Sequence, residues 1–136
     1  MPAPYTGGCQ CGKIRYLLND EPLRFYACHC TVCQQQSGSA FGMSMVMDKE
    51  SVEIKGKLKS FVRTAESGSK VTSFLCPECG NRIYAVSRFN GDTLIIKPGT
   101  LDDTSWLTPS RMIWMKSAQK WVPVPNSMET EEFQGG

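Results

Sequence analysis

The sequence has a single histidine, little net charge and no long apolar segment. Its 136 residues have a formal net charge of +2, which gives no indication of a strongly charged partner such as a nucleic acid. The longest apolar-leaning stretch, Ala40–Met47, is interrupted by Gly42 and Ser44 and is far too short to span a bilayer. No basic segment followed by an apolar run stands at the start, so no signal peptide is expected. These absences predict a cytoplasmic protein that does not contact membranes.

Long amphipathic helices are also missing, and short β-prone runs stand in their place. No segment repeats apolar residues with a helical period over several turns. Runs of β-branched and aromatic residues between turn-forming residues predict strands. The predicted strands are Lys13–Leu18, Arg24–Cys28, Ala40–Met47, Val52–Ile54, Leu58–Val62, Val71–Leu75, Arg82–Ser87 and Thr93–Lys97. A short helical turn is expected after Cys30 or near Leu101–Trp106. The predicted fold is mostly β, with one domain over residues 5–125 and a flexible polar tail over 126–136.

Seven cysteines are the strongest signal in the chain, and all of them lie in close pairs or triples. They form the motifs Cys9-Gln-Cys11, Cys28-His-Cys30-Thr-Val-Cys33 and Cys76-Pro-Glu-Cys79. An odd count leaves one thiol unpaired in any set of disulfides, and disulfides do not persist in a reducing compartment. Closely spaced thiols can hold a metal ion with little further ordering of the chain. The spacing therefore favours metal sites over structural disulfides.

The spacing also indicates which thiols can share an ion. Residues two apart in an extended chain point to the same side, so Cys9 and Cys11 can bind one metal, as can Cys28 and Cys30. His29 would then point away, and we do not predict it to be a ligand.

The third motif has the form of a zinc knuckle. Two residues separate Cys76 from Cys79, and the next residue, Gly80, can adopt the left-handed conformation that such turns need. A thioredoxin-like redox pair would require a helix after the motif. The β-prone segment Arg82–Val86 follows instead, which favours the knuckle.

Seven thiols divide into four and three. Structural zinc takes four protein ligands, whereas catalytic zinc takes three and keeps an open position. One division gives a closed site of Cys9, Cys11, Cys76 and Cys79 and an open site of Cys28, Cys30 and Cys33. A different pairing would still leave one site with three cysteines, and a distant protein group could fill its vacancy. Iron also accepts four thiolates, so the metal itself stays open between zinc and iron.

Four segments together resemble the glutathione-dependent formaldehyde-activating enzyme family, which also includes centromere protein V. They are Gly7–Tyr16, Cys28–Gln34, Ser37–Phe41 and Phe74–Gly80. The resemblance implies a β-rich fold shared with a Rab guanine-nucleotide release factor and methionine-R-sulfoxide reductases, and two zinc ions per chain. By position, Cys9, Cys11, Cys76 and Cys79 would be structural ligands, and Cys28, Cys30 and Cys33 catalytic ones. The implied activity is that of a carbon–sulfur lyase, the condensation of formaldehyde with glutathione to S-hydroxymethylglutathione.

One position departs from the family pattern. Many relatives have a histidine between a proline and a later tryptophan, where this chain has Met112 between Pro109 and Trp121. The substrate could therefore be another small thiol or carbonyl compound. A non-catalytic, zinc-stabilised binding module is the second alternative, as the relation to centromere protein V suggests. The oligomeric state stays open.

The remaining charged and polar segments give weaker signals. A basic cluster lacks interleaved aromatic residues, so it predicts a solvated hairpin face and no nucleic-acid binding. Its members are Lys55, Lys57, Lys59 and Arg63. Arg63, Arg82 and Arg88 are candidates to meet the carboxylates of glutathione. The polar stretch Gln34–Phe41 reads as a surface loop, with Gly38 available for close approach to a bound molecule.

Overall fold

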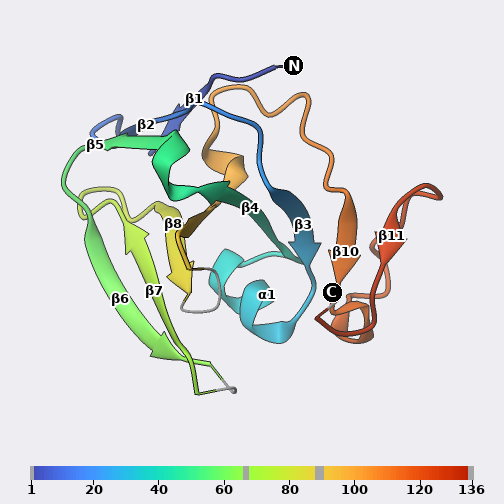
Figure 1. Cartoon of the computed structure of the whole chain (residues 1–136). Helices are drawn as coiled ribbons and strands as arrows, with labels where there is room; N and C mark the ends of the chain where they lie inside the picture. Colours follow the sequence, from blue (N-terminus) through green and yellow to red (C-terminus); the bar gives the residue numbers. More distant parts are fainter. Residues whose placement is uncertain (1, 66–67, 88–90, 135–136) are drawn as a thin grey trace.

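The computed structural model describes residues 2–65, 68–87 and 91–134 and shows the predicted mostly-β fold (Figure 1). The strands are β1 (Tyr5–Gly8), β2 (Arg15–Leu18), β3 (Arg24–Cys28), β4 (Gly42–Asp48), β5 (Val52–Lys55), β6 (Lys59–Thr64), β7 (Lys70–Leu75), β8 (Arg82–Ser87), β9 (Thr93–Ile96), β10 (Arg111–Ile113) and β11 (Glu129–Thr130). The helical elements are α1 (Thr31–Ser37) and the 3-10 turns η1 (Lys49–Ser51), η3 (Pro98–Thr100) and η4 (Met115–Ser117). None of the described helices has the length and apolar character that a membrane crossing requires.

The strands form two sheets. The smaller sheet has the order β1-β2-β5, and the larger has the order β11-β10-β3-β4-β9-β8-β7-β6. All pairs are antiparallel except those of β10, which runs parallel to both β3 and β11. In Figure 1, α1 lies near the middle of the molecule, between the β6–β8 side and the β10–β11 side of the large sheet. The short helix is thus placed over a sheet whose strands come from distant parts of the sequence.

Alternating side chains of the strands build the core. Leu18 from β2, Met45 and Met47 from β4, and Ile83 and Ile96 from β8 and β9 are fully buried and belong to one cluster. Burial of apolar side chains is the main favourable term in folding. This cluster fixes the ends of β3, β8 and β9, where the candidate site residues lie.

A contact between two hydroxyl groups helps connect the small sheet to the segment that follows β9. The phenol oxygen of Tyr16 in β2 lies 2.7 Å from Oγ1 of Thr100. Thr100 Oγ1 in turn donates to the carbonyl of Lys97 at 2.8 Å, so the phenol is the donor to Thr100. Gly7 in β1 allows this contact, because a Cβ at that position would lie 2.5 Å from the Tyr16 ring and hydroxyl.

The predicted strands match the structure closely, and three further strands were not predicted. β3 and β8 have the predicted bounds, and the other predicted strands shift by at most two residues at either end. The predicted helical turn after Cys30 is α1. The missed strands are β1, β10 and β11: β1 contains two glycines, β10 has only three residues, and β11 only two.

Residues 126–134, for which a flexible tail is predicted, contact the sheet in this structure. β11 pairs with β10, and the backbone N–H of Trp114 donates to the carbonyl of Phe133 at 2.7 Å. The Trp114 indole also packs edge-on against the Phe133 ring, at 5.6 Å between centroids. The boundary between the domain and a flexible tail at residues 125 and 126 stays a prediction.

Candidate metal centres and active-site cavity

The structure gathers the seven free thiols into two groups. Cys9, Cys11, Cys76 and Cys79 form one, and Cys28, Cys30 and Cys33 form the other. Within each group, all sulfur atoms lie within 4.8 Å of one another. These are the two sets into which the sequence divides the cysteines.

Two turns bring the four-thiol group together. Cys9 and Cys11 lie in the turn after β1, where Ile14 N–H donates to Cys9 Sγ at 3.3 Å. Cys76 and Cys79 lie in the turn between β7 and β8. This turn closes through a hydrogen bond from Gly80 N–H to the Cys76 carbonyl, with Gly80 in the predicted left-handed conformation at φ 79°. Strand β8 follows this turn and not a helix, which argues against a thioredoxin-like redox pair at Cys76 and Cys79.

The sulfur geometry of this group fits a tetrahedral metal. Zinc–sulfur bonds of about 2.3 Å place the sulfurs of a tetrahedral site roughly 3.8 Å apart. Cys9 Sγ is 3.4 Å from Cys11 Sγ, and Cys11 Sγ is 3.6 Å from Cys76 Sγ. These separations are far longer than a disulfide bond. Although burial acts against ionisation, hydrogen bonds from Ile14 N–H and the neighbouring thiols lower the pKa of Cys9 to about 6.

The three-thiol group lies at the junction of β3 and α1. Cys28 is the last residue of β3, Cys30 is the N-cap of α1, and Cys33 lies in the first helical turn. The Cys33 N–H donates to the Cys30 sulfur at 3.3 Å, so this thiol also caps the helix. Among the described residues, no further His, Cys, Asp or Glu side chain comes within 4.8 Å of all three sulfurs.

Cys33 holds the negative charge of this group most readily. A hydrogen bond from the Cys28 thiol lowers the pKa of Cys33 to about 6 against the opposing effect of burial, and the charges of Lys97 and Arg63 add to this. The same hydrogen bond, followed by burial, raises the pKa of Cys28. A thiolate is the form that binds a metal, so Cys33 is the member of the group most ready to bind one near neutral pH.

At position 42, α1 and β4 approach each other closely. Gly42 pairs with Cys28 across β3 and β4, and a Cβ at Gly42 would lie 3.3 Å from the Cβ of Cys33. The missing side chain lets α1 pack close to β4.

The three thiols form part of the wall of a cavity of about 850 Å³ over one side of the large sheet. Arg24, Tyr26 and Cys28, which alternate along β3, line it, and so do Arg63 and Ala65 from the end of the β6–β7 hairpin. None of the four-thiol cysteines lines this cavity. The three-thiol group is therefore the one that a small molecule can reach from a large cavity.

Positive charge dominates the lining of this cavity. Five cationic side chains and one carboxylate line it: Arg24, Arg63, Arg82, Lys97, Arg111 and Glu129. Arg111 lies 3.5 Å from Glu129 and 3.7 Å from Glu131, so its charge is matched. Among the described residues, no carboxylate oxygen lies within 4.0 Å of the terminal nitrogens of Arg82 or Lys97.

Residues 4–117 match the family described as the glutathione-dependent formaldehyde-activating enzyme. The chain belongs to this family. The match includes all seven cysteines and both thiol groups. Comparison with curated proteins finds no significant match.

A solved structure is similar to this fold. A structural-genomics crystal structure of a Rhodobacter sphaeroides protein superposes with a TM-score of 0.57 and 16% sequence identity. The alignment covers 76% of this chain and 91% of that chain. At this identity the likeness supports the fold alone.

Met112, at the position where the resemblance leads us to expect a histidine, lies away from the cavity. Met112 in β10 is 6% exposed, and its neighbours Arg111 and Ile113 line the cavity, whereas Met112 does not. Side chains alternate along a strand, so position 112 faces the other side of the sheet. The departure at this position therefore leaves the lining of the cavity unchanged.

His29, predicted to point away from the metal, is not part of either thiol group. It is completely buried and packs against Phe41, with 5.0 Å between ring centroids. Neither ring nitrogen has a hydrogen-bond partner among the described residues. Burial lowers the pKa of His29, so the ring is neutral near pH 7.

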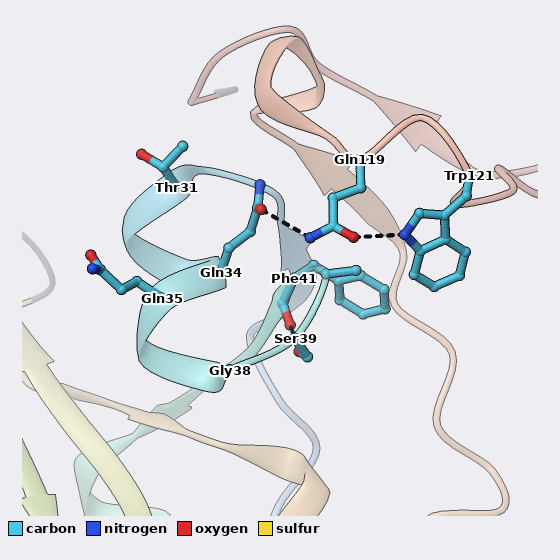
Figure 2. Close-up of a pocket in the computed structure, with 9 residues that line it drawn as sticks. Thr31, Gln34, Gln35, Gly38, Ser39, Phe41, Gln119 and Trp121 are labelled. Carbon is cyan, nitrogen blue, oxygen red and sulfur yellow. Dashed lines mark hydrogen bonds between the residues drawn. The ribbon is translucent and has the colours of Figure 1, made fainter.

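The opposite side of α1 faces a second, shallower hollow of about 810 Å³, shown in Figure 2. Gln119 Nε2 donates to Gln34 Oε1 at 3.1 Å, and the Trp121 indole N–H donates to Gln119 Oε1 at 2.6 Å. Gln34 also donates to the carbonyls of His29 and Ser117. This chain of hydrogen bonds fastens the segment after β10 to α1. Neither a thiol nor a charged side chain lines the hollow.

Several lining residues were missed or only partly predicted from the sequence. Arg63 and Arg82 were named as carboxylate candidates and both line the cavity, whereas Arg88 falls outside the described residues. Lys97 and Arg24 gave no sequence signal, because each stands alone between apolar strand residues. The predicted loop from Gln34 is partly helical, and Gly38 ends α1 in the left-handed conformation at φ 65°.

Proposed function

We propose that the chain is a zinc-dependent carbon–sulfur lyase of the cytoplasm that joins a small thiol to an aldehyde. Glutathione and formaldehyde are the proposed substrates, and S-hydroxymethylglutathione the product. The observation that supports this is the position of the three-thiol group in the wall of a cationic cavity. In this proposal Cys28, Cys30 and Cys33 bind the catalytic zinc, and Cys9, Cys11, Cys76 and Cys79 bind the structural one.

The chemistry needs a thiolate next to a carbonyl carbon. Zinc held by Cys28, Cys30 and Cys33 would lower the pKa of a substrate thiol and so supply a thiolate at neutral pH. Because three thiolates give that site a net negative charge, it suits thiol binding better than activation of water. Cys28, Cys30 and Cys33 orient the incoming sulfur from one wall. As the C–S bond forms, the carbonyl π electrons move to oxygen, which gains a proton, while the thiol proton leaves to solvent.

The activity is tested by exchange NMR at equilibrium, because thiohemiacetals also form without an enzyme. The zinc-loaded protein should raise the rate of exchange between free glutathione and S-hydroxymethylglutathione. An exchange rate equal to that of the protein-free mixture would contradict the proposed activity.

A pair of serine variants separates catalysis from a scaffold role. We expect Cys33→Ser to abolish the rate increase, keep the far-UV circular dichroism spectrum and lower the zinc content by about one equivalent. The matched variant Cys79→Ser should lose the fold, because it opens the four-thiol site. Unfolding of Cys33→Ser with no change in rate per folded molecule would support a zinc-stabilised binding module instead.

A further inference from the structure

The backbone of His29 is held from both sides between two members of the three-thiol group. Its N–H donates to the carbonyl of Ile113 at 2.9 Å, and its carbonyl accepts from Gln34 Nε2 at 2.8 Å. The N–H lies in one peptide plane with the carbonyl of Cys28, and the His29 carbonyl lies in one plane with the nitrogen of Cys30. The two hydrogen bonds therefore fix both peptide planes that join these two cysteines.

The second of these bonds comes from a side chain, the amide of Gln34. This residue directly follows Cys33 in α1 and is half-buried. Its Nε2 also donates to the carbonyl of Ser117 at 3.0 Å, so the two hydrogens of the amide serve two backbone carbonyls. One side chain thus connects the segment between the thiols to the turn η4.

A chain of donors fixes which way round the Gln34 amide lies (Figure 2). An indole N–H can only donate, so Gln119 turns its Oε1 towards Trp121. Its Nε2 then donates to Gln34 Oε1 at 3.1 Å, which leaves Gln34 Nε2 for the carbonyls. A backbone carbonyl can only accept, so both ends of the chain allow the same single direction. A carboxylate at position 34 would have nearly the same shape but could not donate.

We infer that Gln34 is a positioning residue for the three-thiol centre. By holding the His29 carbonyl, it fixes how the thiols of Cys28 and Cys30 are presented and so raises the affinity of the group for a metal ion. Loss of a side chain that orients metal ligands without touching the metal typically lowers metal affinity by about 10–100-fold. This inference rests on the proposed function, because it assumes that the three-thiol group binds a metal ion.

Competition with a metal chelator tests this role without substrate or turnover. Titration of the zinc-loaded protein measures the affinities of both thiol groups, and the Cys33→Ser variant identifies which affinity belongs to the four-thiol group. Gln34→Glu keeps the size of the side chain and removes both donors. We expect it to weaken zinc binding at the three-thiol group by about 10–100-fold and to leave the four-thiol affinity unchanged. The visible absorption spectrum of the cobalt(II)-loaded variant should change as well, because it depends on the arrangement of the ligands.

Two further variants make the result specific. Gln35→Glu makes the same chemical change at the next residue of α1, where the side chain is exposed, and should change neither affinity. Gln119→Leu is a milder change that keeps the inference testable if Gln34→Glu does not fold. It removes the hydrogen bond to Gln34 Oε1 and should weaken zinc binding at the three-thiol group by about two- to tenfold.

Each other outcome has one meaning. Unchanged zinc affinity of the three-thiol group in both Gln34→Glu and Gln119→Leu overturns the inference and leaves the proposed metal site intact. Equal weakening of both thiol groups in Gln34→Glu would show that this side chain only stabilises the fold, which also overturns the inference. Uptake of a single zinc ion by the unmodified protein, at the four-thiol group, would overturn the proposed catalytic site and the positioning role with it.

Discussion

Position 112 is where the resemblance to the family leads us to expect a histidine, and its side chain lies away from the cavity. Met112→His should leave the exchange rate with glutathione and formaldehyde within about twofold of the unmodified protein, because position 112 faces away from the cavity. The imidazole would instead be buried in an apolar environment, lowering the free energy of unfolding by about 1–3 kcal/mol. Denaturant unfolding and exchange NMR measure the two effects.

Met112→Leu is the matched control for that substitution. It conserves volume and apolar character, so its effect on stability should stay below about 1.5 kcal/mol. A large change in exchange rate for Met112→His, with zinc content preserved, would contradict the orientation of β10 described above.

Among the elements, Tyr16 provides one of the contacts between the small sheet and the segment after β9. Burial raises the pKa of Tyr16 to about 12. A group whose pKa is raised on folding contributes stability below its unfolded pKa, near 10, and loses it as pH rises towards the folded value. The unmodified protein should therefore lose stability between pH 10 and pH 12.

Tyr16→Phe isolates that contribution. At pH 9 we expect the variant to be about 1 kcal/mol less stable, because it loses the hydrogen bond to Thr100. As pH rises to 12 the difference should shift by roughly 1–3 kcal/mol in favour of the variant, so that the gap closes or reverses, since only the unmodified protein is weakened by ionisation of Tyr16 in its unfolded state. Urea unfolding at a series of pH values measures both. A gap that stays constant with pH would show that the phenol ionises equally in both states.

For the whole molecule, the two thiol groups should lose metal in separate stages. The four-thiol group joins the turn after β1 to the turn before β8, so its metal links distant parts of the chain. Structural zinc in small peptides contributes about 10–16 kcal/mol, which is enough to decide whether such a fold forms. Removing the three-thiol metal should leave the fold in place.

A titration with a chelator would measure this order. We expect about one equivalent of zinc to leave with no change in far-UV circular dichroism, and a second to leave together with unfolding. The Cys33→Ser variant should show only the second stage. Release of both ions in a single step, with unfolding throughout, would contradict the division into an open and a closed site.

The sequence predicted which thiols within each motif lie together, because the spacing inside a motif is local. Cys28, Cys30 and Cys33 lie within six residues, and the knuckle at Cys76 is marked by its glycine. The cationic lining could not be predicted in the same way. Arg24 begins β3 and Lys97 directly follows β9, and only the order of the large sheet brings these distant parts of the sequence to one cavity. β10 and β11 are too short, at three and two residues, to show the alternation of apolar and polar residues by which a strand is predicted.

The sulfur of Cys30 has two roles, because it caps α1 and belongs to the three-thiol group. It accepts the N–H of Cys33 at the start of α1, and it belongs to the open thiol group. A change at this one atom, whether alkylation, oxidation or loss of its ion, therefore also alters how the first turn of the helix is held. The NMR chemical shift of the Cys33 amide should therefore report whether a metal ion is bound by the three-thiol group, and the measurement needs no substrate.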